Sequence, residues 1–326
     1  MKRSQNKNFS LANFSGKNSR GALEISFGWL FAIIAGIVII FLAIYLSSKL
    51  IGTQQTAVSA ETGQQIGVLL DPMETSFESA QTTSITIPTD TRIDNICIPT
   101  GDFGQQVIQL DQKNFGKWVA TDTRVGFENK YIFSESQVEG QKFYIFSEPF
   151  NFPFKIADLM YITSADVNYC FVGAPNDIST EISQLNQSNL KINDCSDSDV
   201  KVCFGQQRCN INVDFSSDSV EKNGTVMYFS GVSDSKALMY AAIFSNSTVY
   251  ECQVKRLMLR LRELSSLYAN KELITEGKGC DSNLGEELNT LGKDAGNLNQ
   301  SSDLSVIQAE AESIDQTNNA RVCMLW

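Results

Sequence analysis

One stretch decides the fold of this 326-residue chain: Ile25-Ser-Phe-Gly-Trp-Leu-Phe-Ala-Ile-Ile-Ala-Gly-Ile-Val-Ile-Ile-Phe-Leu-Ala-Ile-Tyr-Leu46. It contains no charged residue. At about 1.5 Å per residue, such a helix spans roughly 33 Å, which is enough for the hydrocarbon core of a bilayer. A cleaved secretory signal or a buried core helix would have a shorter apolar run, and the exit Ser47 to Leu50 lacks a small-residue cleavage site. We therefore predict a transmembrane helix within residues 22–50.

The charges on the two sides of this stretch predict its orientation. The first 21 residues carry five positive charges and no acid, whereas only Lys49 follows the apolar run closely. The positive-inside rule then places residues 1–21 in the cytoplasm as a basic tail and the rest of the chain outside the cell. The five positive residues are Lys2, Arg3, Lys7, Lys17 and Arg20.

Composition excludes several classes of function for the part beyond the helix. The chain has a formal charge of −11, and without the basic tail 21 Lys and Arg remain against 37 Asp and Glu. Such an acidic domain repels the phosphates of nucleic acid, so we expect no nucleic-acid partner. Histidine is absent. The commonest general base and metal ligand is therefore missing, which argues against most hydrolase and metalloenzyme designs.

The entrance to the apolar run, Arg20-Gly-Ala-Leu-Glu24, resembles the processing site of archaeal type IV prepilins. The resemblance implies that a membrane peptidase cleaves between Gly21 and Ala22 and that the freed helix packs in the core of a filament. Glu24 lies closer to this bond than the glutamate of that family does. An ordinary signal anchor with a basic flank has the same appearance, and both interpretations stay open.

A second resemblance covers more of the chain. Glu24 to Tyr45, together with Tyr169-Cys-Phe171, Lys201-Val-Cys-Phe-Gly205 and Tyr250-Glu-Cys252, is similar to uncharacterised single-span surface proteins of small-genome archaea. That family has no established activity, so the resemblance implies location at the cell surface and no mechanism.

Beyond the membrane segment we expect three regions and an α+β fold. Residues 51–82 form a helical stalk, because apolar residues recur at helical spacing, and Asp71-Pro72 marks a bend. Residues 83–248 form an antiparallel β-rich extracellular domain of short strands, including Cys209 to Phe215 and Met239 to Phe244, with a short helix at 177–185. Residues 249–326 are helical, with an antiparallel hairpin around Asn299. The apolar stalk residues are Ile66, Leu69, Leu70, Met73 and Phe77.

All eight cysteines lie beyond the apolar stretch, which predicts disulfides in an oxidising compartment. Cys203 and Cys209 flank a five-residue connection between two β-like runs, so a hairpin would join them. Cys280 and Cys323 would lie at the same end of the C-terminal helix hairpin. Three pairings remain open for Cys97, Cys170, Cys195 and Cys252. Closely spaced Cys-x-x-Cys pairs, which zinc sites require, are absent from the sequence.

The remaining motifs are weak. Ser219-Val-Glu-Lys222 and Ser233-Asp-Ser-Lys236 match Ser-x-x-Lys, but the sequence lacks the companion motifs of a serine-lysine enzyme. Asp194, Asp197 and Asp199 alternate in a loop, as calcium ligands do, but without the glycine and glutamate of an EF-hand. We expect no catalytic residue, no metal and no cofactor. Beyond the apolar run, four Asn-x-Ser/Thr triplets are candidate glycosylation acceptors: Asn186, Asn223, Asn246 and Asn299.

These observations predict a membrane-anchored extracellular structural or surface-interaction protein. Its partners would be the lipid bilayer and either further copies of itself or other membrane or pilus subunits. In one form the chain is a pilin-like subunit. In the alternative it is a monomeric surface module that binds a ligand, a glycan or a partner, and an extracellular enzyme ranks third.

Overall fold

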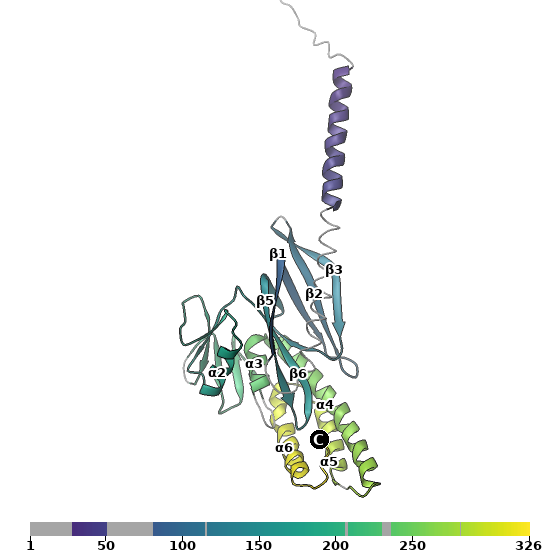
Figure 1. Cartoon of the computed structure of the whole chain (residues 1–326), viewed down its shortest axis with the longest axis vertical. Helices are drawn as coiled ribbons and strands as arrows, with labels where there is room; N and C mark the ends of the chain where they lie inside the picture. The colour runs from purple at the N-terminus through teal and green to yellow at the C-terminus, as the bar shows by residue number, and fades with distance from the viewer. Residues whose placement is uncertain (1–27, 51–80, 115, 206–207, 230–235, 281) are drawn as a thin grey trace, which may run out of the picture. The chain divides into compact units, whose positions relative to one another are not determined.

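The computed structural model of the chain describes residues 28–50, 81–114, 116–205, 208–229, 236–280 and 282–326 (Figure 1). The chain divides into two compact units, Met1–Gly52 and Thr53–Trp326. The first contributes one described helix. The second, called the head below, holds every other described element. The predicted tail at 1–21, the Gly21–Ala22 bond and residues 51–80 of the predicted stalk lie outside the described residues.

The helix Gly28–Leu50 is apolar on every side and has a mean hydropathy of 2.8 over its most apolar 18 residues. None of these residues is buried within the structure, and large side chains such as Phe31, Ile37 and Phe41 are exposed. By length and composition the helix is able to cross a membrane. A helix without a polar face requires an apolar environment, which water does not provide.

The first sheet of the head has six strands in the order β3-β2-β1-β5-β6-β4, and all neighbours are antiparallel except β4 and β6. β1 combines two runs that look separate in the sequence, because its register with β5 shifts between Thr86 and Thr91. Pro88 lies within this shift and lacks the N–H that a regular ladder requires. The strands are β1 Gln81–Ile98, β2 Gln105–Asn114, β3 Lys117–Phe127, β4 Tyr131–Phe133, β5 Gln137–Asn151 and β6 Lys155–Ser164.

The second sheet, in the order β12-β11-β10-β9-β7-β8, corrects the prediction of an antiparallel head. β7 pairs in parallel with β8 and with β9, and β9 pairs in parallel with β10. Between β7 and β8 the chain crosses through helix α2, Asn176–Gln184, and such a crossover returns the chain in the same direction. The strands are β7 Tyr169–Val172, β8 Leu190–Ile192, β9 Val200–Phe204, β10 Ile211–Asp214, β11 Ser219–Lys222 and β12 Thr225–Tyr228.

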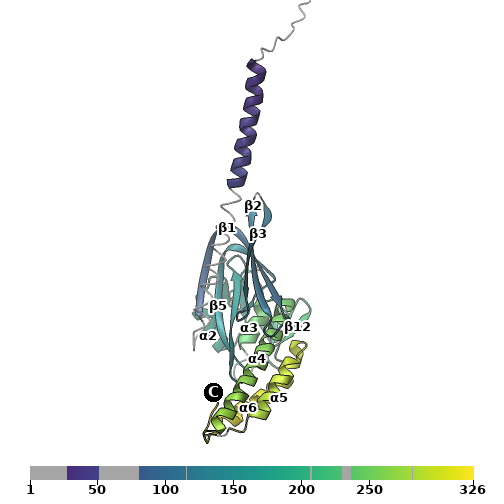
Figure 2. The same ribbon diagram turned by 90° about the vertical axis from the view of Figure 1, so that its right-hand side faces the viewer.

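Helical structure begins earlier than expected. Residues 239–244, predicted to be a strand, belong to helix α3, Lys236–Phe244. Every residue from Ala237 to Phe244 is buried. A run that is apolar at every position has no period by which a strand and a helix can be distinguished. Figures 1 and 2 show the later helices side by side below the first sheet: α4 Ser247–Glu276, α5 Gly285–Gly296 and α6 Leu304–Asn319, with a 3-10 turn at Ser301–Asp303.

Helix α3 lies in the main core of the head, between the two sheets and α4. Phe244 packs edge-on against Phe146 of β5, with ring centroids 5.5 Å apart, and Tyr240 packs against Tyr161 of β6 at 6.2 Å. The Tyr161 hydroxyl donates a hydrogen bond to the Ala237 carbonyl at 2.7 Å. A second, separate cluster of buried side chains belongs to the first sheet and includes Ile93. The head therefore buries two apolar clusters.

The long helix α4 is anchored through buried polar groups. The Arg256 guanidinium donates to the carbonyls of Lys130 and Glu128, each at 2.9 Å, and to that of Phe103 at 3.2 Å. It also lies over the Tyr131 ring, 4.7 Å from the centroid. Burial lowers the pKa of Arg256 to about 10. Because each carbonyl belongs to a loop beside the first sheet, this one side chain ties α4 to that sheet.

Four disulfides staple the head. Cys97 of β1 bonds to Cys252 of α4, and Cys170 of β7 bonds to Cys195. Cys203 bonds to Cys209, and Cys280 to Cys323, the two pairs that the sequence argument proposed. The predicted hairpin between Cys203 and Cys209 is nevertheless wrong, because β9 and β10 run in parallel. The two cysteines are nevertheless close enough to bond, with Cα atoms 5.9 Å apart.

Candidate functional site

A cavity of about 280 Å³ lies at the seam between the two sheets of the head. The first sheet contributes the start of β5 and the end of β6. The second sheet contributes β7, β9, β10 and the end of β11, and α3 contributes Phe244. The residues that line the cavity include Glu135, Glu139, Val167, Tyr169, Val200, Ile211 and Lys222.

Lys222 reaches this seam because of the strand pattern of β11. Val220 and Lys222 are buried while Glu221 between them is exposed, as the alternation of a strand requires. The strand then turns through Asn223 and Gly224, whose φ angles are +53° and +75°. Asn-Gly is the preferred pair for a two-residue hairpin turn with both φ angles positive. The local sequence thus ends β11 with an inward-pointing lysine.

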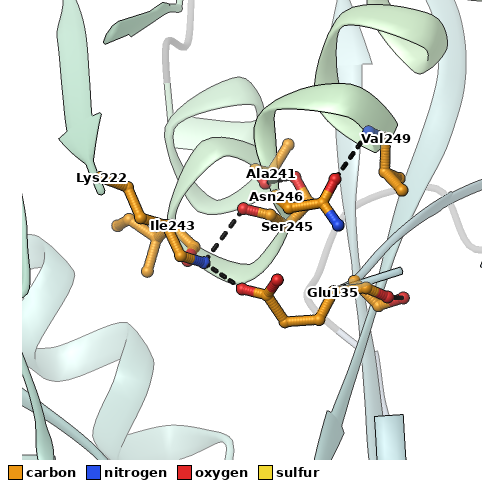
Figure 3. Close-up of polar contacts among 8 residues, drawn as sticks. Glu135, Lys222, Ala241, Ile243, Ser245, Asn246 and Val249 are labelled. Carbon is orange, nitrogen blue, oxygen red and sulfur yellow. Dashed lines mark hydrogen bonds and ion pairs between the residues drawn. The ribbon is translucent and has the colours of Figure 1, made fainter. Parts of the chain in front are cut away.

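All three N–H bonds of the Lys222 ammonium group are used (Figure 3). Its Nζ lies 2.5 Å from Glu135 Oε1, 3.1 Å from the Ile243 carbonyl oxygen and 3.0 Å from the Ser245 carbonyl oxygen. The two carbonyls belong to the end of α3, where the last acceptors of a helix lack intrahelical partners. A cation is also favoured there by the helix dipole. Lys222 therefore joins both sheets to the end of α3.

Besides Lys222, the Asn246 side chain stabilises the connection between α3 and α4. The Asn246 Oδ1 atom accepts a hydrogen bond from the Val249 backbone N–H at 2.9 Å and so caps the first turn of α4 (Figure 3). Asparagine is among the preferred residues at this position. The α3–α4 corner is thus held by the Lys222 ammonium group on one side and by the Asn246 cap on the other.

This arrangement does not supply a serine-lysine pair. Ser219 and Lys222 stand three residues apart on a strand, which separates their backbones by roughly 10 Å. The Ser219 hydroxyl shares a hydrogen bond with Ser217 at 2.8 Å. In the other Ser-x-x-Lys motif, Lys236 Nζ lies 3.2 Å from Asp177 and 3.5 Å from Glu181, while Ser233 lies outside the described residues.

Two polar groups of the cavity retain free hydrogen-bonding capacity within the described part of the chain. Tyr169 is 6% exposed, and burial, assisted by the charge of Glu135, raises the pKa of its hydroxyl. That hydroxyl forms no hydrogen bond with any described residue. The second carboxylate oxygen of Glu135 is in the same situation, and Figure 3 shows it turned away from Lys222. A donor and an acceptor thus stay open at one small cavity.

Of the three aspartates considered as calcium ligands, Asp199 has other partners. Asp199 accepts hydrogen bonds from the Ser196 backbone N–H at 2.8 Å and from Lys191 Nζ at 2.9 Å. The hydrogen bonds from Ser196, followed by those from Lys191, hold the pKa of Asp199 below its usual range. Asp194 lies next to Cys195, whose disulfide to Cys170 anchors the loop to β7. Across the described ranges, no group of three or more His, Cys, Asp or Glu side chains is arranged to hold a metal ion.

The four candidate glycosylation residues fall into two groups. Asn186, Asn223 and Asn299 are exposed in turns, and the first two have positive φ angles. Asn246 is half-buried and its amide caps α4. Because a glycan attached to Asn246 would change the group that caps the helix, the exposed three are the better acceptors.

Sequence reasoning missed the side chains that define the cavity. Lys222 was considered only through a serine motif, although its place in a buried and exposed alternation gave a usable signal. Glu135 lies in the short connection between β4 and β5, where no period exists, and Tyr169 looks like any core aromatic residue. They meet because sheet topology brings positions 135, 169 and 222 to the same seam.

Comparison with known proteins adds no identification. No protein-family model, no curated protein and no solved structure matches the chain.

Proposed function

We propose that this chain is a membrane-anchored extracellular protein that acts by structural or surface interaction. The observation that carries the proposal is the pairing of all eight cysteines into four disulfides within the head. Such a set is typical of an oxidising compartment. The apolar helix Gly28–Leu50 precedes the head and supplies the anchor, and the basic residues before it favour a cytoplasmic N-terminus.

The chemistry of the cavity supports binding over catalysis. A lysine acts as a nucleophile or base only when its amine has a free lone pair, and Lys222 instead donates all three hydrogens to oxygen atoms. The open groups are a phenol and one carboxylate oxygen, which recognise a ligand by hydrogen bonds. The proposed role is therefore non-catalytic.

Lysine labelling on intact cells tests the orientation. A membrane-impermeant amine reagent should modify exposed lysines of the head, such as Lys113 and Lys278, and leave Lys7 and Lys17 unmodified. After the cells are lysed, the lysines of the head should still react, and Lys7 and Lys17 should react in chains that keep the segment before Gly21. Labelling of Lys7 without labelling of the head in intact cells would reverse the proposed topology.

Two forms of this role differ at one peptide bond. The likeness of Arg20 to Glu24 to a prepilin processing site favours an assembly subunit whose mature chain begins at Ala22. A permanently anchored module would keep the segment before Gly21. Mass spectrometry of the N-terminal peptide from the native membrane distinguishes them. A peptide beginning at Ala22 supports the assembly subunit, and recovery of an intact segment from Lys2 to Arg20 removes it.

A further inference from the structure

The cavity between the two sheets is electrically balanced. Lys222 is paired with Glu135, and Glu139 at the rim is paired with Arg92, whose Nη2 lies 2.7 Å from the Glu139 carboxylate. Each charge therefore has its counter-charge within the head. A net charge on a ligand would gain little here, and its desolvation would cost free energy. The balance favours a neutral ligand.

The volume limits the size of that ligand. Pockets for small molecules occupy roughly 300–1,000 Å³, so a cavity of about 280 Å³ lies at the lower end. It admits one small ring-sized molecule or the last unit of a longer chain. Apolar side chains, among them Val200 and Ile211, form part of its wall, and these suit a face made of C–H groups.

The Tyr169 hydroxyl and the second Glu135 oxygen limit the kind of ligand group that the cavity can bind. The Tyr169 hydroxyl can donate or accept a hydrogen bond, and the second oxygen of Glu135 can only accept one. An ammonium group could donate to both groups, but the Lys222 ammonium group beside Glu135 would repel it. A carboxylate or phosphate would accept from Tyr169, but Glu135 would repel it. A hydroxyl group satisfies both, because it accepts one hydrogen bond and donates another.

We propose that this cavity binds a single neutral sugar unit, with one sugar hydroxyl bridging Tyr169 and Glu135. The unit is a hexose or an N-acetylhexosamine, either free or at the end of a glycan. This assignment gives a ligand class to the proposed surface role, and it is tested on the purified protein without reference to topology. Its failure would leave the labelling result on intact cells untouched.

The experiment uses the full chain in detergent micelles. Saturation-transfer NMR is recorded with the methyl glycosides of glucose, galactose, mannose and N-acetylglucosamine, each at millimolar concentration, where weak single-site ligands are detected. At least one should receive saturation. Calorimetry then compares that monosaccharide with an oligosaccharide ending in the same unit. Tighter binding of the oligosaccharide identifies a glycan end as the source, and equal binding identifies the free sugar.

Tyr169→Phe is the decisive variant, with Tyr268→Phe as its control. Tyr169→Phe removes a hydroxyl that forms no hydrogen bond with any described residue, so the head should fold normally while the Kd for the sugar rises about tenfold. Tyr268 packs against Phe154 and Trp326, away from the cavity, and its variant should change the Kd less than twofold. If Tyr169→Phe fails to fold, Val167→Trp replaces it, because Val167 is an exposed residue at the cavity wall and tryptophan would obstruct entry.

Two outcomes overturn the proposal. In the first, none of the four glycosides receives saturation, and the cavity then holds only water. In the second, a glycoside binds, but Tyr169→Phe and Val167→Trp leave its Kd unchanged, which would locate the sugar elsewhere on the chain.

Discussion

The two longest described helices, Gly28–Leu50 and α4, each expose a large apolar side chain to about the same degree but in different surroundings. Ile37 is 60% exposed and Leu267 of α4 is 62% exposed. In the first helix every neighbour of Ile37 along the surface is apolar too, whereas Leu267 stands beside exposed Ser266 and Asn270. A single exposed leucine is ordinary on a soluble protein, but a helix exposed and apolar all round is not.

The buried sides of the two helices differ as well. α4 places Gln253 and Arg256 in the interior, where each finds carbonyl or amide partners. The apolar helix has no such groups between Trp29 and Tyr45, and these two amphipathic aromatic residues stand near its ends. Trp and Tyr favour the two interfaces of a bilayer. The residues around an exposed apolar side chain, and not its exposed fraction alone, therefore indicate whether a helix suits water or a membrane.

The largest expected effect comes from the buried anchor of α4. Arg256→Ala leaves the carbonyls of Phe103, Glu128 and Lys130 without their donor and removes the contact with Tyr131. We expect the free energy of unfolding to fall by about 3–5 kcal/mol. Chemical denaturation followed by tyrosine and tryptophan fluorescence measures it.

Ser266→Ala on the exposed face of α4 is the matched control and should change stability by less than about 0.5 kcal/mol. A loss under about 1 kcal/mol for Arg256→Ala would show that water replaces the guanidinium easily and that α4 is held mainly by its apolar face.

The second largest effect is expected from placing a charge at Ile37, compared with the same change at the equally exposed Leu267. Ile37→Arg puts a charge in the middle of the apolar helix, where membrane insertion should become less favourable by about 2.5–3.5 kcal/mol. The same change at Leu267 keeps the side chain in water and should be tolerated. Alkaline extraction of membranes followed by immunoblotting should recover Ile37→Arg largely in the soluble fraction and Leu267→Arg in the pellet.

Equal recovery of both variants in the membrane pellet would remove the distinction between the two helices. A head that unfolds only in Leu267→Arg would instead mean that a partner covers Leu267, because the isolated structure leaves it exposed.

The smallest effect is at the start of α4. Asn246→Ala removes the side chain that accepts from the Val249 N–H, and we expect a loss of about 1 kcal/mol in the free energy of unfolding. Asn299→Ala removes an exposed asparagine of the same sequon type and should cost less. Thermal unfolding monitored by circular dichroism compares the two, and equal melting temperatures would contradict a capping role for Asn246.

Several helices and strands could be predicted from local sequence patterns, but the residues that form the cavity could not. The predicted short helix at 177–185 agrees with α2 within one residue at each end, because its apolar residues recur at helical spacing. The parallel strand pairs of the second sheet were missed, since strand direction depends on the path between strands. The site was missed for a similar reason, because Glu135, Tyr169 and Lys222 carry no shared motif.

The sequence by itself determined the long apolar helix, the acidic head rich in cysteines and the absence of histidine, because charge, hydropathy and composition are properties of single residues and near neighbours. Only the tertiary structure decided that α3 is a helix at the centre of the core, that β9 runs parallel to β10, and which oxygen atoms surround Lys222. These features depend on contacts between residues up to about a hundred positions apart, and no local period encodes them.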